Sequence, residues 1–289
     1  MIALENDLVK VTINPKGAEL TSIYHKKKEQ EYIWQADPAF WGKHSPVLFP
    51  IVGTLKSDTY YYKNEAYQLS RHGFAREMTF LVEEQSASSA SFSLYSNEET
   101  LKKFPFPFRF TIVYTIIETQ VDISYRIFNT GQNTMLFSVG GHPAFRVPLA
   151  ENTSYEDYYL EFEEEENAGR WPISKDGLIE LTTQPLLNNT FRLPLTKALF
   201  SADALVFKHL RSSSVQLKSD KTNQGFTFHF PGFPYLGIWA AKNADFVCIE
   251  PWCGIADSVN ANQEFTQKEG IESLAANASF KRTWSVNLF

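Results

Sequence analysis

Hydrophobic residues recur at every second position over much of the chain, in short runs separated by turns. In the clearest run, apolar residues at 121, 123, 125 and 127 alternate with polar residues at 122, 124 and 126. Phe226, Phe228 and Phe230 form one face of another run and leave His229 on the opposite face. A period of two is typical of half-buried β-strands. Similar runs predict strands at 8–13, 18–24, 31–34, 134–139, 246–254 and 284–288, and more than a dozen in all.

Helical periodicity is almost absent, and residues 97–103 are the best helix candidate in the first half of the chain. Lys63-Asn64-Glu65 predicts the turn of a hairpin, and 37–53, with its three prolines, predicts a long irregular loop. The acidic run 163–166 predicts a strand end facing water, and the proline-spotted segment 184–204 predicts irregular structure. There is no linker and no repeat. We therefore predict one all-β domain over residues 1–289, a large antiparallel β-sandwich.

Composition narrows the function classes. The net charge is −6, and no basic cluster extends beyond Lys26-Lys27-Lys28, so nucleic acid is not an expected partner. No apolar stretch approaches the length of a membrane-spanning helix, and the first residues do not resemble a signal peptide. The only cysteines are Cys248 and Cys253, so we expect a cytoplasmic protein with reduced thiols. The oligomeric state stays open.

The stretch 138–148, Ser-Val-Gly-Gly-His-Pro-Ala-Phe-Arg-Val-Pro, is the first candidate for chemistry. Its two glycines are expected to let the backbone turn, which places His142 just past a strand end beside Phe145 and Arg146. A histidine in that position can donate or accept a proton near neutral pH. The alternative is a histidine that only hydrogen-bonds to a turn.

Glu250 is the second candidate, because it follows an apolar run and stands two residues before Trp252. A carboxyl buried beside an indole holds its proton more tightly, which suits a general base near neutral pH. The alternative is a carboxylate neutralised by an arginine.

His72, between Arg71 and Arg76, is a third candidate, although the same three residues could simply solvate a turn.

Several reaction classes are not supported. The chain has no Gly-x-Ser-x-Gly elbow, no phosphate-binding glycine loop and no dinucleotide fingerprint. The cysteine spacing does not suit zinc, and a cupin-like set of His72, His142, His229 and Glu250 lacks the compact spacing of a metal-binding strand pair. Acid–base chemistry without metal or cofactor remains, in a cleft rich in aromatic residues. Aromatic faces stack on sugar rings, and His, Asp and Arg bind hydroxyls.

Six motifs, in this order along nearly the whole chain, resemble the aldose 1-epimerase (galactose mutarotase-like) family, with its LacX-like branch as the closest match. They are Phe49-Pro50-Ile51-Val52-Gly53, His72-Gly73-Phe74-Ala75-Arg76, Gly141-His142-Pro143-Ala144-Phe145, Asp203-Ala204-Leu205, Pro234-Tyr235-Leu236-Gly237-Ile238-Trp239 and Cys248-Ile249-Glu250-Pro251-Trp252.

The resemblance implies a β-sandwich in the supersandwich arrangement with an open sugar cleft. It also implies an enzyme that interconverts the α and β anomers of a hexose. Glu250 matches the general base for the anomeric hydroxyl, and His142 matches the acid for the ring oxygen. The resemblance also implies that His72 lies near the ring oxygen or the adjacent hydroxyls and that Asp203 binds sugar hydroxyls. Arg71, Trp252 and Phe145 complete the expected substrate-binding set.

One position departs from the family pattern. Related chains usually carry arginine after the glycine of the Phe-Pro-Ile-Val-Gly loop, and Thr54 stands there instead. Lys56 or Arg71 would have to replace it. Three other functions stay open: a hexose-6-phosphate epimerase that uses arginines 71, 76 and 146, a sugar-binding or sensing module without catalysis, and a glycosidase that uses Asp203 and Glu250.

Overall fold

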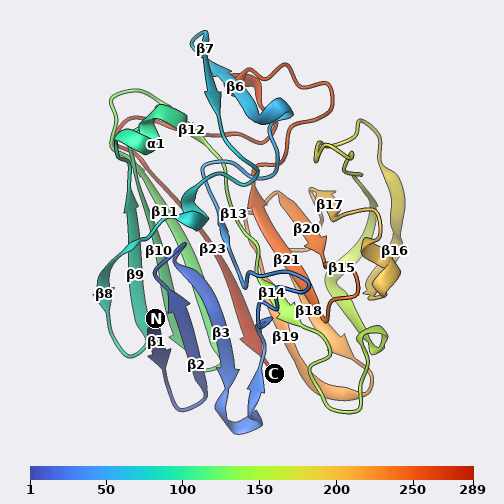
Figure 1. The fold of residues 1–289 in the computed structure, drawn as a ribbon. Helices are drawn as coiled ribbons and strands as arrows, with labels where there is room; N and C mark the ends of the chain where they lie inside the picture. Colours follow the sequence, from blue (N-terminus) through green and yellow to red (C-terminus); the bar gives the residue numbers. More distant parts are fainter.

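The computed structural model describes all residues from 1 to 289 and contains 23 β-strands, one short α-helix and six 3-10 helices (Figure 1). Every pairing between these strands is antiparallel. The helices are α1 (Glu98–Lys103), η1 (Lys26–Lys28), η2 (Lys56–Asp58), η3 (Ala75–Glu77), η4 (Tyr155–Asp157), η5 (Lys197–Phe200) and η6 (Phe265–Gln267). None of the helices is long and apolar enough to span a membrane.

The largest sheet has nine strands and forms one layer of the molecule. Its order is β16 (Gln184–Pro194), β15 (Tyr158–Arg170), β18 (Ser214–Ser219), β19 (Thr222–His229), β23 (Ser279–Leu288), β11 (Gln120–Asn129), β10 (Phe108–Ile117), β9 (Ser89–Tyr95) and β8 (Leu81–Gln85). The C-terminal strand β23 therefore lies in the middle of this sheet, between strands from the two halves of the chain.

A six-stranded sheet carries the residues of the candidate site. Its order is β17 (Leu205–Lys208), β20 (Tyr235–Trp239), β21 (Phe246–Cys253), β13 (Val139–Gly141) and β5 (Val47–Leu48), with β14 (Ala144–Arg146) also paired to β21. A four-stranded sheet is made by β1 (Ile2–Glu5), β2 (Val9–Asn14), β3 (Glu19–His25) and β4 (Gln30–Glu31). Two two-stranded sheets complete the fold: β12 (Met135–Phe137) with β22 (Glu272–Leu274), which are distant in the chain, and the hairpin of β6 (Thr59–Tyr62) and β7 (Glu65–Gln68).

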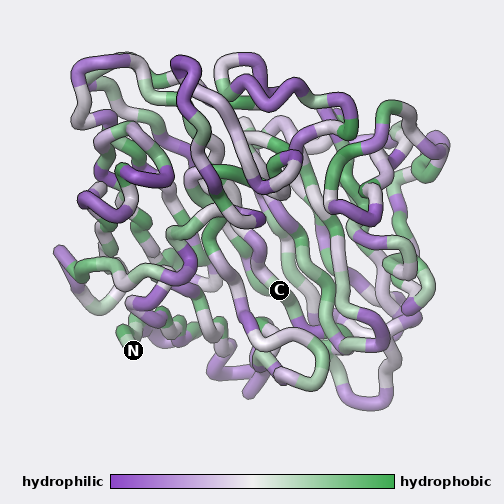
Figure 2. The backbone as a smooth tube through the Cα atoms, turned by 45° about the horizontal axis from the view of Figure 1, so that its top comes forward, coloured by the Kyte–Doolittle hydropathy of each residue, from purple (hydrophilic) through white to green (hydrophobic).

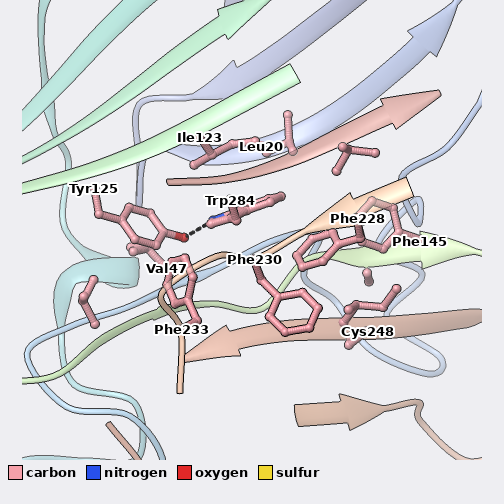
Figure 3. Close-up of a cluster of buried hydrophobic side chains, with 14 of the residues drawn as sticks. Leu20, Val47, Ile123, Tyr125, Phe145, Phe228, Phe230, Phe233, Cys248 and Trp284 are labelled. Carbon is pink, nitrogen blue, oxygen red and sulfur yellow. Dashed lines mark hydrogen bonds between the residues drawn. The ribbon is translucent and has the colours of Figure 1, made fainter. Parts of the chain in front are cut away.

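The hydrophobic residues of the alternating runs lie in the core, and the polar residues between them face outward. Figure 2 shows the outer loops as mostly hydrophilic, whereas the inner strands carry the hydrophobic positions. In Figure 3, Trp284 and Phe228 of the nine-stranded sheet and Phe145 and Cys248 of the six-stranded sheet lie in one buried cluster. The two sheets thus pack face to face, as in a sandwich, and the prediction of an all-β fold is confirmed. The Trp284 indole donates a hydrogen bond of 2.8 Å to the Tyr125 hydroxyl inside this core.

Several local predictions are also confirmed. The run at 121–127 lies within β11, and the phenylalanines at 226 and 228 are buried in β19 while His229 is half-buried. The hairpin turns at Lys63 and Asn64, both with positive φ, as a tight antiparallel turn requires. The predicted helix begins after Asn97, whose side chain accepts a hydrogen bond from the backbone N–H of Thr100.

Two predictions about the middle of the chain were wrong. The strand does not end at the acidic run, because β15 continues to Arg170. Glu166 is buried and accepts hydrogen bonds from the backbone N–H and the hydroxyl of Ser212. The segment 184–204 is not irregular throughout, since β16 occupies its first part. Pro185 and Pro194 fit there because β16 is an edge strand, where a missing N–H costs little.

The strand predicted at 31–34 is shorter than expected. Only Gln30 and Glu31 pair within β4, and Ile33 makes an isolated bridge to Phe145. The Glu31 carboxylate accepts hydrogen bonds from the backbone N–H groups of Ile23 and Ile33, each within 2.9 Å. The Tyr32 N–H still donates to the Ile23 carbonyl, but the Ile23 N–H goes to this side chain instead of the backbone, so the pairing is incomplete beyond Glu31.

Candidate active site

A cavity of about 570 Å³ opens on the six-stranded sheet, and it brings together six of the seven predicted site residues. Its volume lies within the range of small-molecule sites, roughly 300–1,000 Å³. The six residues come from strands β13–β14 and β21 and from two loops, and they are Arg71, His72, His142, Asp203, Glu250 and Trp252. The cavity is therefore the candidate active site.

Strand β21 supplies Glu250 and Trp252 on its cavity side, and all eight of its residues are buried. Burial raises the pKa of Glu250 to about 8; the positive charge of Arg71 opposes this increase, and the negative charge of Asp203 adds to it. The Trp252 indole lies against the backbone of Gly237 on β20. A Cβ at that glycine would lie 2.5 Å from the indole ring, so only glycine leaves room for it.

His142 lies in the short connection between β13 and β14 and is held by aromatic rings. The Trp41 indole stacks on the imidazole at 4.9 Å with an interplanar angle of 27°, and Trp239 approaches edge-on at 5.6 Å. Burial lowers the pKa of His142 to about 3, and the positive charges of Arg71 and Arg76 act in the same direction. The imidazole is therefore neutral at pH 7, and it would have to gain a proton before it could act as the acid that the resemblance implies.

The imidazole Nε2 of His142 lies 3.3 Å from Oε2 of Glu250. Because their pKa values are shifted in opposite directions, the resting pair holds one proton, on the carboxyl. An ionised carboxylate beside a protonated imidazole contains the same number of protons. The two states are tautomers related by one proton transfer, and burial favours the uncharged one because it disfavours both charged groups.

His72 is fixed in one orientation by the backbone of Gly53. The Gly53 N–H donates to Nδ1 of His72 at 3.1 Å, while the His72 N–H donates to the Gly53 carbonyl. Burial holds the pKa of His72 well below its usual value, so the neutral ring carries its single proton on Nε2. The Arg71 Nε, 3.3 Å from Nε2, is then a second donor facing that atom, so we interpret it as a contact rather than a hydrogen bond.

The turn that presents His72 depends on the glycine that follows it. His72 itself has φ of 69°, and Gly73 has φ of 73°. A Cβ on Gly73 would lie 2.3 Å from the carbonyl oxygen of Phe49. That carbonyl accepts the N–H groups of Phe74 and Ala75, so the chain must approach it closely. The glycine of the His-Gly-Phe-Ala-Arg motif therefore has a steric cause.

Asp203 and the two arginines line other parts of the wall. Asp203 has the strained φ of 130°, and its Oδ1 accepts a hydrogen bond from the Ala204 N–H at 2.7 Å. Arg76 donates through Nη2 to the carbonyl of Arg71, whereas its buried Nε has no partner. The one carboxylate that reaches it, Glu77, lies 4.0 Å away and already pairs with Lys16 and Lys43.

Phe145 is the one predicted site residue that the structure places elsewhere. It is fully buried in the core, with its ring 4.4 Å from that of Phe226. The glycines before His142 do not form a turn either, because Gly140 and Gly141 belong to β13. Their missing side chains leave room for Trp252 on one face and for the Tyr125 hydroxyl on the other.

Lys56 and Arg71 were the two residues considered as replacements for the family arginine, and only Arg71 lines the cavity. Thr54 does not line the cavity, and the Lys56 ammonium donates to the carbonyls of Val259 and Ala261. Arg146 is exposed and lies outside the cavity. Arg71 alone remains to take that place.

Sequence reasoning missed part of the wall. Trp41 and Trp239 cover His142, and an apolar side formed by Ile173, Ile179 and Val206 faces the polar residues. Trp41 belongs to the irregular loop 37–53, and Trp239 closes the Pro-Tyr-Leu-Gly-Ile-Trp motif, so both lay in segments already singled out. No comparable signal marked the apolar side.

His142, Cys248 and Glu250 form the one group whose donor atoms, within 4.8 Å of one another, could hold a metal ion. Burial raises the pKa of the Cys248 thiol well above its usual value, and it also raises that of Glu250. At neutral pH the three donors therefore carry no negative charge. A divalent cation would have to displace two protons to bind, so the donor set does not favour a resident metal.

Comparisons with known proteins agree with one another. Residues 1–271 match the family model described as Aldose 1-epimerase. The chain is 34% identical over 296 residues to Protein LacX of Lactococcus lactis subsp. lactis, with 99% of each covered. Among solved structures it resembles a galactose mutarotase related enzyme from Lactobacillus acidophilus, with a TM-score of 0.95 and 35% identity over 100% of this chain and 97% of that one. A galactose mutarotase-like protein from Lactobacillus casei gives 0.94 and 32%, with both chains fully covered.

Proposed function

Because the chain belongs to the aldose 1-epimerase family, we propose that it interconverts the α and β anomers of a hexose, with Glu250 and His142 as the acid–base pair. The observation that carries the proposal is the buried pair itself, 3.3 Å apart, in a cavity of sugar-binding size. His72, Asp203 and Arg71 provide polar groups for the hydroxyls, and Trp252 provides an aromatic face.

The proposed reaction needs two proton transfers in opposite directions. Binding of the closed sugar favours the charged tautomer, in which Glu250 is ionised and His142 is protonated. Glu250 takes the proton of the O1 hydroxyl, and His142 gives its proton to the ring oxygen. The bond between C1 and the ring oxygen breaks, and C1 and O1 form a carbonyl.

Ring closure reverses these steps on the other face of the carbonyl. The open-chain sugar rotates about its C1–C2 bond, His142 takes the proton from the ring-oxygen hydroxyl, and Glu250 returns a proton to O1. The pair is uncharged while the chain is open and charged while the ring is closed. It keeps one proton throughout the cycle, so neither cofactor nor solvent proton is needed.

Polarimetry of freshly dissolved α-glucose and α-galactose tests the proposal. We expect faster equilibration with the protein than without it, and a loss of about a hundredfold or more in turnover for Glu250→Gln and for His142→Asn. His229→Ala is the control, because this half-buried histidine lies on β19 outside the cavity. Sugar binding by calorimetry with no acceleration would instead indicate a sugar-binding module without catalysis.

A second candidate substrate is a hexose 6-phosphate, and the charge balance of the cavity favours it. Two guanidinium groups, those of Arg71 and Arg76, face the single carboxylate of Asp203, because Glu250 retains its proton. Arg76 also keeps a buried Nε without a partner. An anionic group on the sugar would neutralise this excess and accept those hydrogen bonds.

NMR exchange between anomeric protons can compare glucose with glucose 6-phosphate directly. If the arginines bind phosphate, the phosphorylated sugar is the better substrate, inorganic phosphate competes with it, and Arg76→Met removes the preference. Arg146→Met is the matched control, since it removes an exposed arginine outside the cavity. Equal rates for both sugars, unchanged in Arg76→Met, would show that the arginines do not select a phosphorylated sugar. Release of sugar from aryl glycosides would instead indicate a glycosidase.

A further inference from the structure

A buried ion pair lies behind the cavity wall, outside the acid–base pair. Asp257 and Lys268 meet at 2.7 Å, and their side chains are 5% and 3% exposed. The Lys268 ammonium also donates to the carbonyl of Ile255 at 2.7 Å. The other carboxylate oxygen of Asp257 accepts the backbone N–H of Lys56 at 2.9 Å. Both oxygens of this carboxylate are therefore used, one by a cation and one by the segment 53–56.

The segment 53–56, which Asp257 fixes, also holds His72. The Asp257 N–H donates to the carbonyl of Thr54 at 2.9 Å, and Thr54 follows Gly53, whose N–H donates to Nδ1 of His72. Ala256 packs against Gly53 so closely that a Cβ at Gly53 would lie 2.5 Å from that of Ala256. A continuous set of contacts thus leads from Lys268 through Asp257 and the segment 53–56 to the imidazole of His72.

We propose that Asp257 and Lys268 are positioning residues for His72, because they fix the segment 53–56 and so direct the Gly53 N–H at Nδ1. With Nδ1 occupied as an acceptor, the ring proton stays on Nε2, which faces the cavity. The inference rests on the proposed function only in assigning His72 to the sugar. The tautomer itself is a property of the empty protein.

Stability alone is a poor reason for a charged pair in this place. Removing two charges from water is costly, and well-packed apolar residues of similar volume often stabilise a fold equally well or better. An apolar pair, however, could not accept the Lys56 N–H. The carboxylate of Asp257 therefore does what an apolar side chain could not, because it accepts the Lys56 N–H and so fixes the orientation of the segment 53–56.

The test combines a spectroscopic and a kinetic measurement on the full chain. In the wild type, ¹⁵N NMR of the His72 ring should show Nδ1 unprotonated and Nε2 protonated. In Lys268→Met and in the uncharged double variant Asp257→Leu with Lys268→Met, we expect a mixture of both tautomers. We also expect kcat/KM to fall about tenfold or more, since small misplacements of site groups have effects of that size.

The decisive comparison measures Lys268→Met in a protein that also carries His72→Asn. If the pair acts through His72, Lys268→Met should lower kcat/KM less than twofold once His72 is replaced. Ile127→Ala is the control for general destabilisation, because it empties part of the core on β11 without touching the hydrogen bonds of the segment 53–56, and it should leave the tautomer unchanged. A single unchanged tautomer in both pair variants, or losses that multiply fully in the His72→Asn background, would overturn the proposal. The NMR result stands even if the protein has no epimerase activity.

Discussion

His142 and Glu250 lie 3.3 Å apart, and burial shifts their pKa values in opposite directions, to about 3 and about 8. In water the carboxyl would lose its proton well before the imidazole does. Inside the cavity this order is inverted, so one proton belongs to the pair over a wide pH range. An acid–base cycle that returns the pair to its starting state can therefore operate throughout that range.

The first prediction is a broad pH profile with a maximum between the two limits. Activity should fall below about pH 3, where the pair gains a second proton, provided that the protein remains folded. It should fall above about pH 8, where the pair loses its only proton. Initial rates of mutarotation, corrected for the buffer-catalysed rate, measure both limits. A narrow optimum centred near pH 5, between ordinary carboxyl and imidazole values, would contradict the inverted order.

The second prediction concerns stability. Above about pH 4.5 an unfolded chain releases the Glu250 proton, whereas the folded protein keeps it up to about pH 8. At Glu250 the folded state therefore holds a proton that the unfolded state has released, and the contribution of this carboxyl to stability falls as pH rises through the window. Since one pKa unit corresponds to about 1.4 kcal/mol, the effect amounts to several kcal/mol.

Glu250→Gln removes this linkage while it keeps the shape of the side chain. The Tm of the variant minus that of wild type should therefore increase from pH 5 to pH 8 and remain constant above pH 8. Thermal unfolding followed by circular dichroism is sufficient to measure it. A difference that does not change with pH would mean that Glu250 ionises at its ordinary value in the folded protein.

The sequence predicted structure and chemistry best where the cause lies in neighbouring residues. The alternation at 121–127 and the phenylalanines of β19 predicted buried strand faces, because one face of such a strand must avoid water. The apolar run before Glu250 predicted a buried carboxyl with a raised pKa, and burial does raise that pKa to about 8, although the Trp252 side chain acts in the opposite direction. These predictions succeeded because their causes lie within a few residues of one another.

Predictions failed where the cause lies far along the chain. Phe145 looked like a cleft residue beside His142, yet β14 turns its ring toward Phe226 in the core. Burial makes His142 neutral, and Trp41, which stacks on its ring, comes from a distant loop. The edge position of β16, which makes Pro185 and Pro194 tolerable, depends on the order of the whole sheet. None of these relationships leaves a local pattern in the sequence.

The third prediction tests why β20 carries a glycine. Gly237→Ala would place a methyl group 2.5 Å from the Trp252 ring, so the indole must move. We expect a loss of about 1–3 kcal/mol in stability, typical of overpacking, together with a higher KM. Gly42→Ala is the control, because the added Cβ would lie 3.9 Å from its nearest neighbours. An unchanged KM and Tm in Gly237→Ala would show that Trp252 is not held against this strand.

The fourth prediction concerns Trp41, which stacks on His142 and separates it from water. In Trp41→Ala the imidazole becomes more exposed, and burial is the main cause that lowers its pKa. The pKa of His142 should therefore rise from about 3 toward its ordinary value, and the acidic limit of activity should move to higher pH by the same amount.

Phe40→Ala is the matched control for Trp41→Ala. This neighbouring aromatic residue is 46% exposed and contacts Trp34 rather than His142, so its removal should leave the acidic limit unchanged. NMR titration of the His142 ring gives the pKa directly in each variant, and the pH dependence of initial rates gives the kinetic limit. If the two shift together in Trp41→Ala and neither shifts in Phe40→Ala, the indole controls when the acid–base pair gains its second proton. If the NMR pKa rises while the acidic limit stays in place, that limit belongs to another group, and the assignment of His142 to it is wrong.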